Sequence, residues 1–153
     1  MDIDVTADWY WEGNVVEAIA RFLEQGGWTI VAKADTHSKK SGVDIQAGKD
    51  SQIILFEVKG YPSTHYRDPR RSDEVKRTNP TNQAQQWYSH ALLKAMRLQT
   101  KHPEALVVLG FPDFPRYRTL FAETQSGLAK LGVGFLMVGE DGRVTTWGLH
   151  GQF

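Results

Sequence analysis

Two short segments carry acidic and basic side chains at a spacing that suits metal-dependent hydrolysis. The first is Gly42-Val43-Asp44-Ile45, and the second, in which Glu57 follows Asp44 by thirteen residues, is Phe56-Glu57-Val58-Lys59. Because side chains alternate along a strand with period two, Glu57 and Lys59 point to the same face. If the two segments pair as a hairpin, Asp44 near the start of one strand lies close to Glu57 near the end of the other.

Two converging carboxylates with an ammonium beside them suit Mg²⁺ or Mn²⁺, which prefer oxygen ligands and usually retain several waters. Such an ion can activate water and stabilise the charge that develops on a phosphodiester, while Lys59 orients the water or balances the oxyanion. The alternative is a set of solvated charges on the open face of a hairpin. Against it, the run Ile53-Ile54-Leu55-Phe56 and Val58 make the second strand apolar on both faces, which indicates a central strand. Charges at the end of a central strand are costly without a role.

Two predicted helices offer further polar residues. On the helix predicted over 12–25, Glu12 lies about 20° from Ile19, at the centre of the apolar stripe, whereas Glu17 lies about 160° away and is expected on the surface. Glu12 either completes the acidic site or only caps the first turn. Gln83, at the edge of the stripe of a second helix, either holds a water or phosphate oxygen or makes a local hydrogen bond.

The elements that must position these residues follow from hydrophobic periodicity and turn chemistry. Helices are predicted over 12–25, from 80 to about 99, and over about 117–131. Strands are predicted over 28–32, 43–47, 52–59, 105–110, 133–138 and 144–147. In the second helix the apolar stripe comprises Ala84, Trp87, Ala91, Ala95 and Leu98. The order αβββαβαββ predicts an α/β fold, with a mixed sheet flanked by helices in a single domain spanning residues 1–153.

Composition excludes several classes of protein. The chain has 153 residues, 18 basic and 18 acidic, with no Cys. Neutrality argues against a generic polycation that coats nucleic acid, and the lack of Cys excludes disulfides, thiol nucleophiles and Cys-based metal sites. The sequence has no apolar run of about 18 residues and no signal-peptide pattern, so a cytoplasmic protein without a membrane span is expected.

The charge is nevertheless uneven along the chain. Residues 33–102, which include Asp44, Glu57 and Lys59, carry thirteen basic and seven acidic side chains. The basic residues in the two polar stretches that flank the site are candidates for binding nucleic-acid phosphates: Lys39, Lys40, Arg67, Arg70, Arg71, Lys76 and Arg77. The alternative is that these stretches are solvated loops. No base-reading motif is present, so no sequence specificity is predicted.

A Glu on the first helix, the Gly-Val-Asp-Ile strand, the Glu-Val-Lys strand and a helix that opens with Gln-Ala resemble the PD-(D/E)XK nuclease superfamily. That superfamily has the restriction-endonuclease-like fold and includes Holliday junction resolvases and Mrr-type enzymes. The resemblance covers about residues 11–138, although Asp44 lacks the preceding proline that names the motif. Gly-Trp-Thr-Ile, Glu-Val-Lys and Gln-Ala are also similar to the element-excision controlling-factor proteins of cyanobacteria, which belong to the same superfamily.

The resemblance implies an αβββαβ core followed by a C-terminal helix and hairpin. It also implies that Asp44 and Glu57 bind Mg²⁺ or Mn²⁺, that Lys59 assists the attacking water, that Glu12 completes or supports the metal site, and that Gln83 is an additional polar residue. The leading hypothesis is therefore a metal-dependent nuclease that hydrolyses DNA. The alternative is a non-catalytic nucleic-acid-binding or partner-binding protein that retains the nuclease fold. For a chain of this length, we expect either a homodimer that presents two sites or a partner subunit that supplies target recognition.

Overall fold

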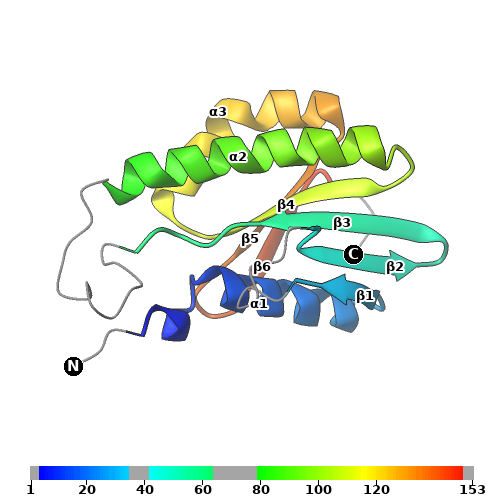
Figure 1. Cartoon of the computed structure of the whole chain (residues 1–153), viewed down its shortest axis with the longest axis horizontal. Helices are drawn as coiled ribbons and strands as arrows, with labels where there is room; N and C mark the ends of the chain where they lie inside the picture. Colours follow the sequence, from blue (N-terminus) through cyan, green and yellow to red (C-terminus); the bar gives the residue numbers. More distant parts are fainter. Residues whose placement is uncertain (1–3, 35–41, 64–78, 150–153) are drawn as a thin grey trace.

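The structure, a computed structural model, describes residues 4–34, 42–63 and 79–149 (Figure 1). A short 3-10 helix, η1 (Val5–Ala7), precedes α1 (Glu12–Gln25), α2 (Pro80–Lys101) and α3 (Pro115–Leu131). The strands are β1 (Thr29–Lys33), β2 (Ile45–Lys49), β3 (Gln52–Val58), β4 (Leu106–Pro112), β5 (Gly134–Val138) and β6 (Val144–Trp147). The predicted order αβββαβαββ is confirmed, and the predicted ends of these helices and strands are within two residues of those observed. None of the described helices is long and apolar enough to cross a membrane.

The six strands form one mixed sheet in the order β1-β2-β3-β4-β5-β6. The first three strands are antiparallel to one another, β3, β4 and β5 are parallel, and β6 returns antiparallel to β5. Helix α1 covers one face of the sheet, and α2 and α3 cover the other (Figure 1). This arrangement is the predicted restriction-endonuclease-like αβββαβ core, followed by α3 and the β5–β6 hairpin. Strand β3 is central, as its apolar sequence predicted.

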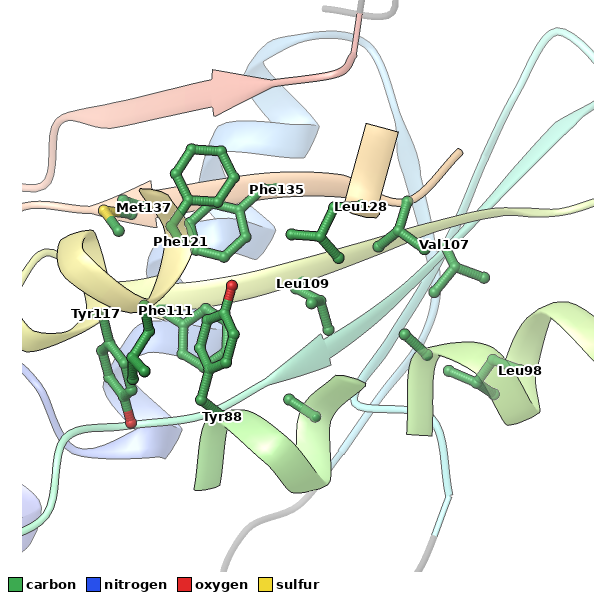
Figure 2. Close-up of a cluster of buried hydrophobic side chains, with 14 of the residues drawn as sticks. Tyr88, Leu98, Val107, Leu109, Phe111, Tyr117, Phe121, Leu128, Phe135 and Met137 are labelled. Carbon is green, nitrogen blue, oxygen red and sulfur yellow. The ribbon is translucent and has the colours of Figure 1, made fainter. Parts of the chain in front are cut away.

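Alternation along β3 divides its side chains between two cores. Ile54, Phe56 and Val58 pack with α1, whereas Leu55 joins the cluster beneath α2 and α3. Figure 2 shows part of that second cluster, in which aromatic rings from both helices and from β4 and β5 pack together. A strand buried on both faces has no solvated side on which to place a charge. Any charged residue at its end therefore needs local partners.

The predicted apolar stripe of α2 is wrong at one position. Trp87 is half-buried, and its neighbour Tyr88 is 2% exposed instead. The Tyr88 hydroxyl forms a hydrogen bond of 2.6 Å with Thr124 Oγ1 on α3. Because α2 packs against α3 as well as against the sheet, its buried face is rotated toward α3, and the hydroxyl partner lets a tyrosine be buried there.

The turn between β2 and β3 sets the register that the site depends on. Asp50 and Ser51 have positive φ angles of 48° and 71°, which is the backbone of a two-residue hairpin turn. Pairing then runs from Lys49 opposite Gln52 to Ile45 opposite Phe56. The hairpin loop therefore has two residues, whereas the predicted strands 43–47 and 52–59 left four residues between them, and β2 begins two residues later than predicted.

Candidate active site

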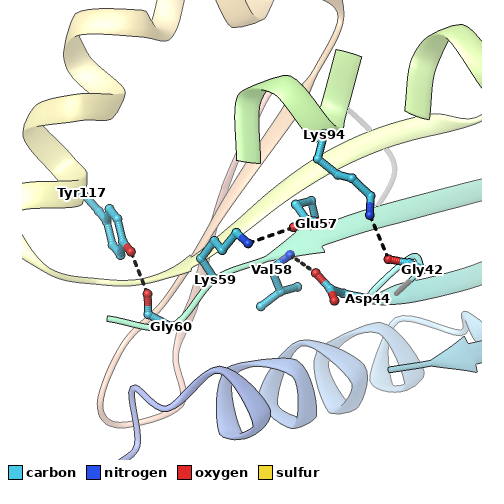
Figure 3. A network of polar contacts seen from close by, with 8 residues as sticks. All are labelled: Gly42, Asp44, Glu57, Val58, Lys59, Gly60, Lys94 and Tyr117. Carbon is cyan, nitrogen blue, oxygen red and sulfur yellow. Dashed lines mark hydrogen bonds and ion pairs between the residues drawn. The ribbon is translucent and has the colours of Figure 1, made fainter. Parts of the chain in front are cut away.

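Asp44 and Glu57 lie side by side where β2 begins and β3 ends. Ile45 pairs with Phe56, so the next residues in register are Asp44 and Glu57. The Asp44 amide donates to the Phe56 carbonyl at 3.2 Å, and the Val58 amide donates to Asp44 Oδ2 at 2.7 Å (Figure 3). The carboxylate of Asp44 thus accepts from a backbone amide at the end of the ladder, which holds it in one orientation. The structure therefore brings the two carboxylates together as the hairpin argument predicted.

Glu57 is a buried charged residue with an incompletely paired carboxylate. It is 6% exposed, and Lys59 Nζ lies 3.3 Å from its Oε1. Its Oε2 is buried and accepts no hydrogen bond from the part of the chain that the structure describes. The Lys59 side chain is 24% exposed, so its ammonium contacts Glu57 while keeping access to solvent. The predicted same-face arrangement of Glu57 and Lys59 is present.

Glu12 reaches this end of the sheet because the chain after β3 passes very close to the start of α1. A Cβ on Gly60 would lie 2.6 Å from both Glu12 N and the Tyr10 carbonyl oxygen, so only glycine permits this approach. The Tyr61 amide donates to the Tyr10 carbonyl at 3.0 Å, and the buried Tyr117 hydroxyl donates to the Gly60 carbonyl at 2.7 Å (Figure 3). Glu12, the half-buried first residue of α1, therefore sits within electrostatic range of Asp44 and Lys59.

Burial dominates the electrostatics of the three acids. It raises the pKa of Glu57 to about 7, an effect that the charge of Asp44 increases and that Lys59 and Lys94 oppose. It also raises the pKa of Glu12 to about 7, again with a contribution from Asp44 and opposition from Lys59. The pKa of Asp44 is raised by burial too, although the Val58 amide, a side-chain hydrogen bond with Glu57 and the two lysines act against this. The charge of Asp44 raises the pKa of both Glu12 and Glu57, an effect that a bound cation would relieve.

Lys94 is a site residue that the sequence reasoning missed. It lies in the middle of α2, is half-buried, and donates from Nζ to the Gly42 carbonyl at 3.2 Å (Figure 3). A signal for it was available, because eleven residues of helix rotate Lys94 only about 20° from Gln83. The helix edge that carries Gln83 therefore also carries a lysine three turns further on.

Of the remaining predicted site residues, Gln83 is described by the structure, whereas the basic residues lie outside the described ranges. Gln83 lies in the first turn of α2, and its Oε1 is buried without a hydrogen-bond partner among residues 4–34, 42–63 and 79–149. Glu17 is on the surface as expected, paired with Lys33 at 2.7 Å. The predicted phosphate-binding residues fall outside the described residues: Lys39, Lys40, Arg67, Arg70, Arg71, Lys76 and Arg77.

The donor chemistry at Asp44 and Glu57 fits a hard divalent cation. Within the described ranges, no group of three or more His, Cys, Asp or Glu residues is arranged to hold a metal ion. Mg²⁺, however, is commonly bound through one or two carboxylates, with waters completing its octahedral shell. The buried Oε2 of Glu57 offers an acceptor with no partner among those residues, and Asp44 stands opposite it. Two carboxylates are therefore the ligand set that these residues offer.

The sequence matches no family model and no curated protein. The fold, by contrast, has been seen before. An XisH family protein from Nostoc punctiforme PCC 73102 has a similar structure, with a TM-score of 0.52 and 20% identity, covering 87% of this chain and 97% of that chain. An fdxN element excision controlling factor protein from Anabaena variabilis is similar with a TM-score of 0.53 and 20% identity, covering 87% of this chain and 96% of that chain. The expected similarity to excision controlling factors is confirmed for the fold, and membership of the PD-(D/E)XK superfamily stays a prediction.

Proposed function

We propose that this protein is a metal-dependent nuclease that hydrolyses DNA phosphodiester bonds at Asp44, Glu57 and Lys59. The observation that carries the proposal is the buried carboxylate of Glu57, which ends a central strand with one oxygen unpartnered among the described residues. Burying a carboxylate that is compensated only in part, by Lys59 at 3.3 Å from one oxygen, costs hydration free energy, and such a cost is typical of functional sites. A ligand role toward Mg²⁺ or Mn²⁺ offsets that cost.

Each residue of the proposed site has a distinct task. Asp44 and Glu57 would hold the ion, which supplies a more acidic bound water and positive charge for the phosphate oxygens. The Val58 amide fixes the orientation of Asp44, so this ligand is preorganised by β3 itself. Lys59, anchored on Glu57 but still partly exposed, orients the attacking water or neutralises charge that develops on the phosphate. Glu12 offers a further carboxyl group from the α1 side, within electrostatic range of Asp44.

The proposal is tested by measuring cleavage of plasmid DNA in Mg²⁺ or Mn²⁺, with EDTA as the metal-free control. We expect cleavage only with metal, and a loss of roughly 10²–10⁴-fold in Lys59→Ala. Lys130→Ala is a matched control, because Lys130 lies in the last turn of α3, about 20 Å along that helix from Tyr117, which contacts the site. The proposal is refuted if the wild-type protein cleaves no DNA in Mg²⁺ or in Mn²⁺, or if Lys59→Ala cleaves as well as wild type.

The second candidate is a non-catalytic nucleic-acid-binding or partner-binding protein that retains this fold. Its support is the similarity in fold to the fdxN element excision controlling factor protein. Titration with Mn²⁺ separates the two functions. A protein that binds no Mn²⁺, and whose DNA binding is unaffected by Asp44→Asn, supports the second function, whereas Mn²⁺ binding that Asp44→Asn abolishes supports the first.

A further inference from the structure

Lys94 differs from the other cations of its helix. Arg97 and Lys101, further along α2, are exposed, as expected for charged side chains on a helix surface. Lys94 is half-buried, and its side chain extends from α2 toward the start of β2, where it contacts the Gly42 carbonyl (Figure 3). Lys94 thus directs its ammonium to the start of β2, whereas Arg97 and Lys101 lie on the exposed surface of α2.

Within residues 4–34, 42–63 and 79–149, the Lys94 ammonium donates a hydrogen bond to a neutral backbone carbonyl. An ammonium has three N–H donors, and among the described residues Lys94 donates to a neutral carbonyl rather than to a carboxylate. The ion pair of Glu57 is made with Lys59 instead. The hydrogen bond of Lys94 to the carbonyl of Gly42, two residues before Asp44, nevertheless places its ammonium at the end of the sheet where Asp44 and Glu57 lie (Figure 3). Lys94 therefore adds positive charge beside Asp44 and Glu57, while the ion pair of Glu57 is made with Lys59.

Resting on the proposed nuclease function, we propose that Lys94 binds a phosphate oxygen of the DNA strand that lies over Asp44 and Glu57. Lys59, just beyond β3, and Lys94, on α2, reach the acidic pair from two different elements (Figure 3). A phosphodiester at the pair then meets an ammonium from each of them. Lys59 serves the chemical step, whereas Lys94 serves binding of the strand.

A merely structural role for Lys94 makes a different prediction. If Lys94 only anchors the Gly42 carbonyl, and through it Asp44, then any side chain with a suitable N–H donor should serve. Lys94→Gln keeps a donor but removes the charge, and Lys94→Arg keeps both. Binding of phosphate requires the charge, because neutralising a phosphate releases a condensed counterion. The glutamine variant therefore separates the two roles.

The test is binding of a short fluorescein-labelled DNA duplex in EDTA, measured between about 50 and 200 mM NaCl. We expect Lys94→Gln to weaken binding roughly three- to tenfold and to reduce the slope of log K against log[NaCl] by about 0.9. Lys94→Arg should keep the wild-type slope. Lys101→Gln removes the same charge from an exposed position two turns further along α2 and should change the slope far less. Unfolding in urea verifies that each variant is folded.

The inference is overturned if wild-type protein does not bind the duplex, if Lys94→Gln keeps the wild-type slope, or if Lys101→Gln lowers it equally. Because EDTA removes the metal, this result is independent of cleavage. A protein that cleaves DNA in Mg²⁺ but shows no Lys94 effect refutes the role of Lys94 alone. A protein that loses a phosphate contact in Lys94→Gln but cleaves nothing refutes the nuclease function alone.

Discussion

Replacing Glu57 with glutamine removes a buried charge at nearly constant shape, and the structure sets the size of the effect. The pKa of Glu57 is about 7 in the folded protein, against an ordinary value of 4.5. That difference corresponds to about 3 kcal/mol of stability lost when the carboxyl ionises. The attraction of the partly exposed Lys59 is already contained in that folded-state pKa, so it is not subtracted again. Above pH 7, without metal, we therefore expect Glu57→Gln to be about 3 kcal/mol more stable than wild type.

The dependence on pH has a definite sign. Because the folded-state pKa of Glu57 lies above the ordinary value, the folded protein binds more protons than the unfolded chain between about pH 4.5 and 7. The stability contributed by protonated Glu57 is complete below pH 4.5 or so and is lost as the pH rises through about 7. Glu12, with the same direction and a pKa of about 7, adds to the decline. Stability of the metal-free wild type should therefore fall from mildly acidic to mildly alkaline pH.

Urea unfolding in EDTA, at about pH 5 and about pH 8, measures both effects. We expect the advantage of Glu57→Gln to grow between these two conditions, whereas Glu24→Gln, an exposed control on α1, should follow wild type. Adding Mn²⁺ near pH 8 should stabilise wild type but not Glu57→Gln. The reasoning is refuted if Glu57→Gln is less stable than wild type near pH 8, or if both lose stability equally between the two pH values.

Three further predictions concern the surroundings of the acidic pair. Tyr117→Phe leaves the buried Gly60 carbonyl without its donor and should lower the free energy of unfolding by about 1–3 kcal/mol in urea; an unchanged value would contradict this. Gly60→Ala forces a Cβ against Glu12 N and should destabilise by about 1–3 kcal/mol or more, so a wild-type urea midpoint would refute the close approach. Lys59→Met should reduce DNA cleavage by roughly 10²–10⁴-fold without weakening Mn²⁺ binding by calorimetry, and weaker Mn²⁺ binding would show that Lys59 organises the ligands.

Local sequence patterns were enough to predict the meeting of Asp44 and Glu57. Turn residues between two apolar strands predicted a hairpin, and period-two alternation placed Glu57 and Lys59 on one face. Both arguments need only neighbouring residues, and the pairing of Ile45 with Phe56 agrees with them. The same patterns could not distinguish Trp87 from Tyr88 on α2, because burial there depends on how α3 packs against α2.

By itself, the sequence determined the order of elements, the central position of β3 and the pairing that sets Asp44 opposite Glu57. Each of these follows from periodicity and turn chemistry within a few tens of residues. Two contacts were decided only by the tertiary structure. Lys94 of α2 reaches the start of β2, and Gly60 lies in close contact with the first turn of α1. Both contacts join residues more than thirty positions apart. Both contacts depend on where each helix packs on the sheet. That position is determined by the burial of many apolar side chains in both cores together, which no local sequence pattern encodes.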